Sequence, residues 1–86
     1  MYKVEFTPQA ENSFARLDKD IAQRVANKIA WLSQNLKNIT PEPLTAKFKG
    51  KYKLRVGDWR IIYSTNQPLM TITIYEIEHR SKIYKT

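Results

Sequence analysis

Lysine and arginine occupy every second position from Lys47 to Arg55, in the stretch KFKGKYKLRV. Alternate side chains of an extended chain point to the same side, so the spacing predicts a row of five cations: Lys47, Lys49, Lys51, Lys53 and Arg55. Such a row suits phosphate groups, because lysine and arginine donate charge-assisted hydrogen bonds to phosphate oxygens. The alternative is a solvated outer face of a sheet, on which edge lysines only guard against aggregation.

The dipeptide Gly57-Asp58 is a turn signal directly after this row, and a two-residue type II′ loop there fixes the register of a hairpin. In that register Arg55 lies opposite Arg60. One face carries an apolar set that helices should cover: Tyr52, Leu54, Val56, Trp59, Ile61 and Tyr63. The other face carries Lys51, Lys53, Arg55 and Arg60. Like charges placed opposite each other weaken a hairpin, so the paired arginines favour an anion-binding role.

The C-terminal segment EHRSKIYKT adds further candidates: His79, Arg80, Lys82, Tyr84 and Lys85. They follow the inferred central strand directly, so we expect them to reach the same basic face. Tyr84 is either a core contact or an aromatic platform for an unpaired RNA base. His79 is either a structural residue or a base, since neighbouring cations would favour its neutral form.

One strand and two helices are expected to precede the hairpin. Tyr2, Val4 and Phe6 alternate with polar residues, as in a half-buried strand. Thr7-Pro8 predicts the start of a first helix and Asp18 the start of a second. The second helix carries an apolar stripe at helical spacing that ends near Asn38, before the breaker stretch TPEP: Ile21, Val25, Ile29, Leu32 and Leu36.

Beyond Leu44 the period of the apolar residues changes to two, which indicates strands. The return strand of the hairpin is expected at Trp59–Ser64, a turn at Thr65–Pro68, and a β-branched strand at Met70–Ile77. The order β-α-α-β-β-β predicts an α+β fold. In it, a two-helix hairpin packs on one face of a small, mainly antiparallel sheet.

Length and composition restrict the classes of function. Eighty-six residues predict a single domain, residues 1–86. With no cysteine and one histidine, we expect no disulfide, metal site or cofactor. No signal peptide or membrane segment is evident, which favours a cytoplasmic protein without a membrane partner. The net charge of +7, of which +5 lies in residues 42–86, favours polyanionic partners.

The stretch YKLRVGDWRIIYS, followed by an apolar strand and EHRSKIYK, resembles the RelE/ParE superfamily of bacterial type II toxins. The resemblance covers essentially the whole chain, and its most specific parts are L-R-x-G-x-W-R-I-I-Y and H-R-x-x-x-Y. RelE-like members are ribosome-dependent ribonucleases that cut mRNA in the ribosomal A site. ParE-like members share the fold but inhibit DNA gyrase without nuclease chemistry.

Resemblance to the RelE-like branch implies which residues act. The implied catalytic residues are Lys51, Lys53, Arg60, Arg80 and Tyr84, with His79 as an alternative to Arg80. The implied RNA-binding residues are Lys47, Lys49, Arg55, Lys82 and Lys85. The chain departs from the family at Glu78, where a glycine is usual, and in the shorter spacing from Arg80 to Tyr84.

The implied reaction is metal-independent attack of a ribose 2′-OH on the adjacent phosphate, which leaves a 2′,3′-cyclic phosphate and a 5′-OH. The implied roles are phosphate binding for Arg55 and Arg60, proton abstraction for Lys51 or Lys53, protonation of the leaving oxygen for His79 or Arg80, and stacking for Tyr84. The neutral form that a lysine base needs is favoured by crowding of like charges. The ribosome would orient the substrate.

Two other functions remain open at this point: a ParE-like gyrase inhibitor, and a basic RNA-binding module without toxicity. Either toxin implies a cognate RelB-like antitoxin in a hetero-oligomer, an acidic and partly disordered partner that wraps the helices and covers the basic face.

Overall fold

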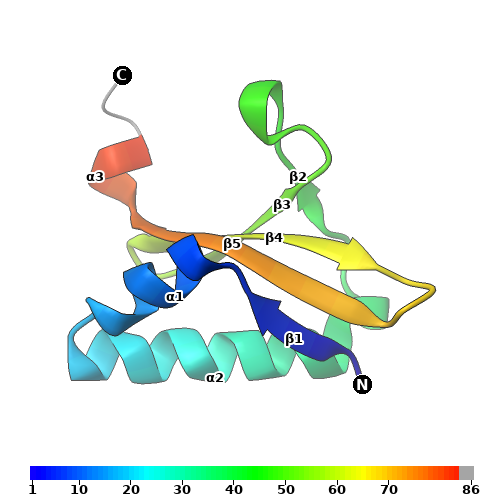
Figure 1. Ribbon diagram of the computed structural model, residues 1–86, viewed down its shortest axis with the longest axis horizontal. Helices are drawn as coiled ribbons and strands as arrows, with labels where there is room; N and C mark the ends of the chain where they lie inside the picture. Colours follow the sequence, from blue (N-terminus) through cyan, green and yellow to red (C-terminus); the bar gives the residue numbers. More distant parts are fainter. Residues whose placement is uncertain (84–86) are drawn as a thin grey trace.

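The computed structural model describes residues 1–83, with side chains described through residue 81. Two helices pack against one face of a five-stranded sheet (Figure 1). The strands are β1 Lys3–Phe6, β2 Glu42–Pro43, β3 Tyr52–Val56, β4 Trp59–Asn66 and β5 Thr71–His79. The helices are α1 Pro8–Ala15, α2 Lys19–Asn35 and α3 Arg80–Ile83, with 3₁₀ turns η1 Leu36–Asn38 and η2 Ala46–Phe48. None of these helices has the length and apolar character needed to cross a membrane.

The helices begin where the sequence predicts. Thr7 is the N-cap of α1, its hydroxyl accepts from the Ala10 N–H at 3.1 Å, and Pro8 follows at the first helical position. Asp18 precedes α2, but its carboxylate makes no capping hydrogen bond within the described chain. The predicted apolar stripe of α2 faces the sheet, since Val25 and Leu32 are fully buried.

The sheet order is β1-β5-β4-β3-β2, in which only the β1–β5 pair is parallel. This confirms the mainly antiparallel sheet. The predicted central strand, β5, is an interior strand, but the centre is occupied by β4, because β2 adds a fifth strand at the β3 edge. Strand β2 was not predicted, because its residues lie in the breaker stretch TPEP. Glu42 pairs with Lys53 and Pro43 with Tyr52, an edge position in which a proline costs little.

The hairpin has the predicted register at all five pairs, including Val56 with Trp59 and Arg55 with Arg60. Gly57 has φ +59 whereas Asp58 has negative φ, as a type II′ turn requires. The predicted apolar face packs on the helices. Ile61 and Tyr63, both fully buried, lie in the core.

A register shift in the β4–β5 pair changes which side chains face the helices. Ile62 pairs with Glu76 and Tyr63 with Ile74, so β5 holds one extra residue at this point. Ile74 and Ile77 consequently both lie in the core, although simple alternation would place them on opposite faces. Tyr75 and Glu76, between them, face the opposite side of the sheet, which we call the far face.

The predicted row of five cations is wrong for its first two members. Lys47 lies in η2 and Lys49 directly follows it, so neither belongs to a strand. Ala46 with φ +57 and Gly50 with φ +88 turn the chain here, and the strand begins only at Tyr52. The alternating pattern that is typical of a strand therefore continues in the sequence through residues that form turns in the structure. Residues 44–51 form a lobe that rises on the side of the sheet away from α2 (Figure 1).

Candidate nucleic-acid interface

Three of the predicted cations meet on the far face. Lys53 and Arg55 come from β3, and Arg60 comes from β4, directly opposite Arg55. Lys51 joins them just before β3, where its ammonium lies 4.6 Å from the centre of the Tyr75 ring. The basic face of the hairpin is therefore confirmed as a geometric arrangement.

Arg60 occupies the middle of this face. Arg55 is its partner on one neighbouring strand and Glu78 its partner on the other. The side chain is partly buried, and its Nε is buried without a hydrogen-bond partner in the described part of the chain. Buried N–H groups nearly always have a partner, and a guanidinium N–H pairs best with an oxyanion. Arg60 thus holds an unused donor beneath the far face, and a phosphate oxygen could accept from it once the partly exposed side chain turns outward.

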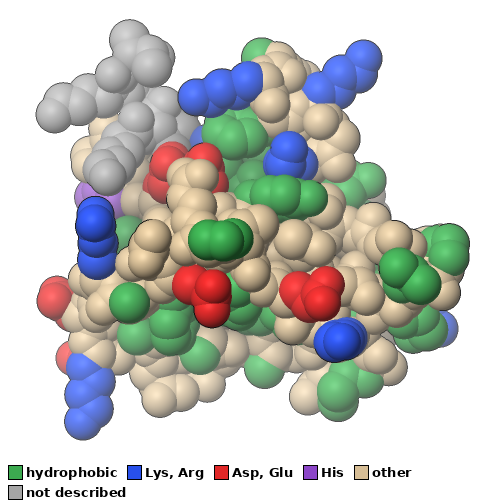
Figure 2. All heavy atoms as spheres, viewed as in Figure 1, with side chains coloured by type: hydrophobic (Ala, Val, Ile, Leu, Met, Phe, Trp, Pro, Cys, Tyr) green, Lys and Arg blue, Asp and Glu red, His purple; other side chains and the backbone are tan. Residues whose placement is uncertain are grey.

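The far face also carries carboxylates, which the sequence analysis did not place there. Glu42 of β2 lies 3.3 Å from the Lys53 ammonium, and β5 contributes Glu76 and Glu78. In Figure 2 basic side chains extend from the lobe at the top of the view. The far face is mixed in charge, with cations on β3 and β4 and carboxylates on β2 and β5.

Two aromatic side chains beside the cations were missed in the sequence. Tyr75 accepts a hydrogen bond from the Ser64 hydroxyl at 3.2 Å, and the Lys47 ammonium lies 5.2 Å from the Phe48 ring centre. Ile62, on the same face, is fully buried outside the helix-side core. The available signal was the stretch TITIYEIE, in which isoleucines three residues apart interrupt strict alternation.

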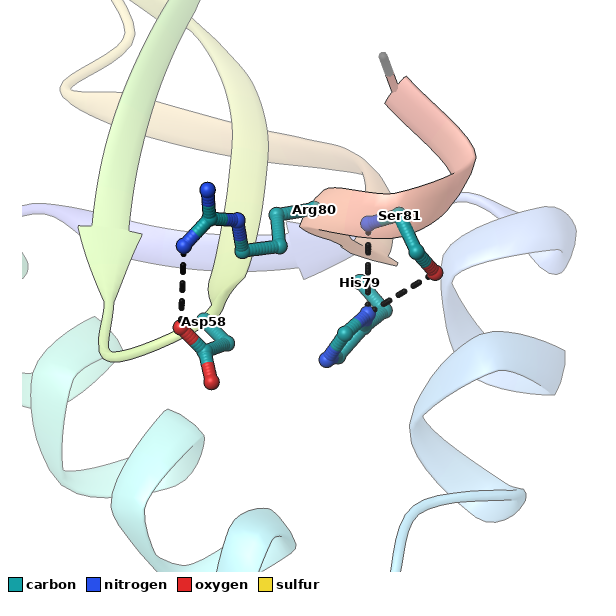
Figure 3. A network of polar contacts seen from close by, with 4 residues as sticks. All are labelled: Asp58, His79, Arg80 and Ser81. Atoms are coloured by element: carbon teal, nitrogen blue, oxygen red, sulfur yellow. Dashed lines mark hydrogen bonds and ion pairs between the residues drawn. The ribbon is translucent and has the colours of Figure 1, made fainter. Parts of the chain in front are cut away.

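His79 does not reach the basic face, and the expectation that it would is wrong. It lies two residues after Ile77 and therefore points to the helix side, where its ring meets the edge of Trp59 at 5.2 Å between centroids. Its Nδ1 lies 2.9 Å from the Ser81 hydroxyl. Figure 3 shows His79 and Arg80 leaving the chain in different directions.

Arg80 is held at the turn of the hairpin. Its backbone N–H donates to the Asp58 carbonyl oxygen at 2.8 Å, and its guanidinium lies 3.7 Å from the Asp58 carboxylate (Figure 3). Both side chains are largely exposed. The side chain of Lys82, and Tyr84 and Lys85, lie outside what the structure describes. Within residues 1–83 no group of three or more His, Asp or Glu is placed to hold a metal.

Comparisons with known proteins agree with this fold. A family model described as "ParE toxin of type II toxin-antitoxin system, parDE" matches residues 4–84, and no curated protein sequence matches the chain. The RelBE2 toxin–antitoxin complex from Mycobacterium tuberculosis is similar with TM-score 0.81 and 26% identity, over 93% of this chain and 92% of that one. The archaeal RelE–RelB complex from Pyrococcus horikoshii gives 0.70 and 25%, over 94% and 97%. Isolated Escherichia coli RelE shares the fold, with TM-score 0.78 and 14% identity, over 98% and 92%.

Proposed function

The chain belongs to the ParE toxin family of type II toxin–antitoxin systems, within the RelE/ParE superfamily. We propose that it acts within this superfamily as a ribosome-dependent endoribonuclease. Its substrate is mRNA in the ribosomal A site. The reaction is attack of a ribose 2′-OH on the adjacent phosphate, with a 2′,3′-cyclic phosphate and a 5′-OH as products.

The buried, unpartnered Nε of Arg60 is the observation that carries this proposal. A phosphate oxygen that accepts from Nε would satisfy a donor that the fold leaves unused. Arg55, directly opposite, adds a second guanidinium to the same place. Preorganised donors of this kind stabilise the charge that develops on phosphate during attack.

The proton steps are assigned from the arrangement of the far face. The Lys53 ammonium is already paired with the Glu42 carboxylate at 3.3 Å, so we assign Lys53 to neutralising phosphate charge and not to proton abstraction. Glu78 pairs with Arg60 across β4 and β5, and a positioned carboxylate can act as a general base. We therefore add Glu78 to Lys51 as a candidate base, whereas Arg80 and Tyr84 keep the roles that the family resemblance implies. His79 serves to position the start of α3.

The site alone does not orient free RNA well enough for fast cleavage, and in this proposal the ribosome supplies that orientation. Holding the 2′-OH in line with the phosphate contributes up to roughly 7–11 kcal/mol in favourable intramolecular cases. A shallow, mixed-charge face gives little such orientation to a flexible strand. Comparable cleavage rates on naked RNA and on ribosomes would contradict this account.

The test is primer-extension mapping of mRNA in a reconstituted translation system, with and without ribosomes. Wild type should produce cuts inside A-site codons that require ribosomes, and Arg60→Ala should abolish them. Arg16→Ala, which removes an exposed arginine at the end of α1, is the matched control and should cut like wild type. Failure of folded wild type to cut would overturn the proposal.

Inhibition of DNA gyrase is the second candidate, and the ParE description of the matching family model favours it. It predicts that the purified protein inhibits supercoiling by gyrase. It also predicts that Arg60→Ala still arrests growth and induces DNA-damage signalling. The nuclease proposal predicts neither result, so one supercoiling assay separates the two functions.

We also propose a RelB-like antitoxin as the partner, since two of the similar structures are toxin–antitoxin complexes. The exposed cations Lys47, Lys49 and Arg55 suit an acidic segment that would cover the far face and exclude RNA. Antitoxin and RNA should therefore compete, and the competition should weaken as salt is raised.

A further inference from the structure

A pocket of about 400 Å³ opens on the far face between the lobe, the start of α1 and the bulge of β5. The side chains that matter for its chemistry are Gln9, Lys47, Phe48, Lys51, Tyr75 and Glu76. Lys51 belongs to both the pocket and the basic face. Glu76 of the pocket pairs with Ile62, which lies two positions along β4 from Arg60, about 6.6 Å. An RNA held at Arg60 therefore has a neighbouring nucleotide within reach of the pocket.

The walls of the pocket combine aromatic rings with lysines. The β5 bulge turns Tyr75 to this side, and its hydroxyl is held by Ser64 at 3.2 Å. Phe48 faces it from the lobe side, with the Lys47 ammonium 5.2 Å from its ring centre. Aromatic rings next to cations are how proteins hold unpaired bases, because every base has a stacking face. The Lys51 ammonium lies over the Tyr75 ring at the end of a flexible side chain. An incoming base can displace this ammonium at little cost.

The polar groups of the pocket favour one base. Glu76 presents a carboxylate there, oriented by the Gln9 amide, which donates to its Oε1 at 2.9 Å. A carboxylate accepts from adjacent N–H groups, and guanine presents two of them, N1–H and the N2 amino group. Lysine donates to guanine O6 and N7. Lysines and a carboxylate in one pocket therefore match guanine better than adenine, cytosine or uracil.

We propose that this pocket binds an unpaired guanine next to the phosphate held by Arg60, stacked on Tyr75 and Phe48. The inference rests on the proposed function for its RNA substrate and extends it to recognition of one base. It makes Tyr75 and Phe48 positioning residues, and Glu76 the residue that determines specificity.

Binding is measured without cleavage by using fluorescent RNA trinucleotides that carry 2′-O-methyl groups, since these lack the attacking hydroxyl. Each has guanine, adenine, cytosine or uracil at the centre between uracils, and fluorescence anisotropy gives the dissociation constant. Guanine should bind about ten-fold or more tightly than the other three, as one well-made base contact provides. Equal binding of all four, or no binding by wild type, would overturn the proposal.

Three variants test the assigned residues. Tyr75→Leu and Phe48→Leu should each weaken guanine binding by roughly ten-fold, the typical loss of one stacking contact, whereas Tyr75→Phe should retain it. Glu76→Gln should reduce the preference for guanine over adenine. Leu69→Ser changes an exposed apolar side chain in the turn between β4 and β5, away from the pocket, and should bind like wild type.

The binding measurements can be interpreted separately from folding defects of the variants and from failure of the proposed nuclease. Phe48 lies in a lobe outside the core, so Phe48→Leu tests the pocket even if Tyr75→Leu fails to fold. Wild-type affinity of folded Phe48→Leu and Tyr75→Leu would contradict the proposal. Absence of ribosome-dependent cleavage together with intact guanine binding would instead contradict the proposed nuclease and leave the pocket standing.

Discussion

Arg80 donates its backbone N–H to the carbonyl oxygen of Asp58 at 2.8 Å, which ties the first residue of α3 to the turn between β3 and β4. The ion pair between the same residues is exposed, so it contributes less than about 1 kcal/mol. The backbone bond does not depend on either side chain. The conformation of the turn therefore sets where the C-terminal segment starts.

Gly57→Ala should disturb this relationship. At φ +59 an alanine is strained, and its Cβ would lie 2.7 Å from Nη2 of Arg24. We expect a loss of about 1–2 kcal/mol in the free energy of unfolding, together with shifted amide resonances at Arg80. Gly50→Ala is the matched control, since φ is +88 but no atom lies within 4 Å. Urea unfolding should show a loss for both variants, because both φ values are positive, but the Arg80 resonance should move only in Gly57→Ala.

Arg60→Lys separates charge from geometry at the proposed phosphate site. Lysine keeps the positive charge but lacks the buried Nε–H, so RNA affinity should change little while ribosomal cleavage falls about 10²–10³-fold. Single-turnover cleavage on programmed ribosomes measures this loss. Arg55→Lys, at an exposed position, should lose less than about ten-fold. An equal loss of cleavage for Arg60→Lys and Arg55→Lys would contradict the specific role proposed for the Arg60 Nε–H.

Glu78→Gln tests the carboxylate opposite Arg60. If this group takes the 2′-OH proton, cleavage on ribosomes should fall about 10²–10⁴-fold. Affinity for the 2′-O-methyl trinucleotides should stay equal or increase, because a negative charge is removed from the RNA-binding face. Glu11→Gln, at an exposed position on α1, is the control. Cleavage by Glu78→Gln within three-fold of wild type would contradict Glu78 as the base and leave Lys51 as the candidate.

Much of the hairpin was predictable because its register depends on local chemistry. Gly57-Asp58 permits one tight turn, and that turn fixes all five pairs, including Arg55 with Arg60. The helix starts were equally local, since Thr7 and Pro8 act on the adjacent turn. The four cations of the basic face followed from that register alone.

The remaining part of the site depends on contacts between distant segments. Glu42 reaches Lys53 because β2 adds to the sheet edge, although its residues read as a breaker. Tyr75 and Glu76 share a face because of a bulge that depends on packing on both sides of β5. The side of the sheet on which His79 lies was predictable from Ile77, because side chains two residues apart on a strand point to the same face. Ile77 lies in the core, so His79 belongs on the helix side and not on the basic face.

Stability above pH 10 should depend on Tyr63. Burial, with a smaller contribution from the nearby Tyr52 hydroxyl, raises the pKa of Tyr63 from 10.0 to about 12. The neutral phenol is thus favoured in the folded state, and this contribution is complete below pH 10 and lost as pH rises from 10 to about 12. It amounts to about 2–3 kcal/mol. Urea unfolding of Tyr63→Phe should show a shallower loss than wild type across that range, and parallel curves would contradict the assignment.

The parallel pairing of β1 with β5 has a consequence for the order of events during synthesis. Lys3–Phe6 is synthesised well before its partner Thr71–His79. The two helices can form from local contacts, whereas the first strand must wait for a partner distant in sequence. Glu78, Tyr75 and the bulge belong to that later segment. The proposed RNA site therefore cannot assemble until β5 has been synthesised.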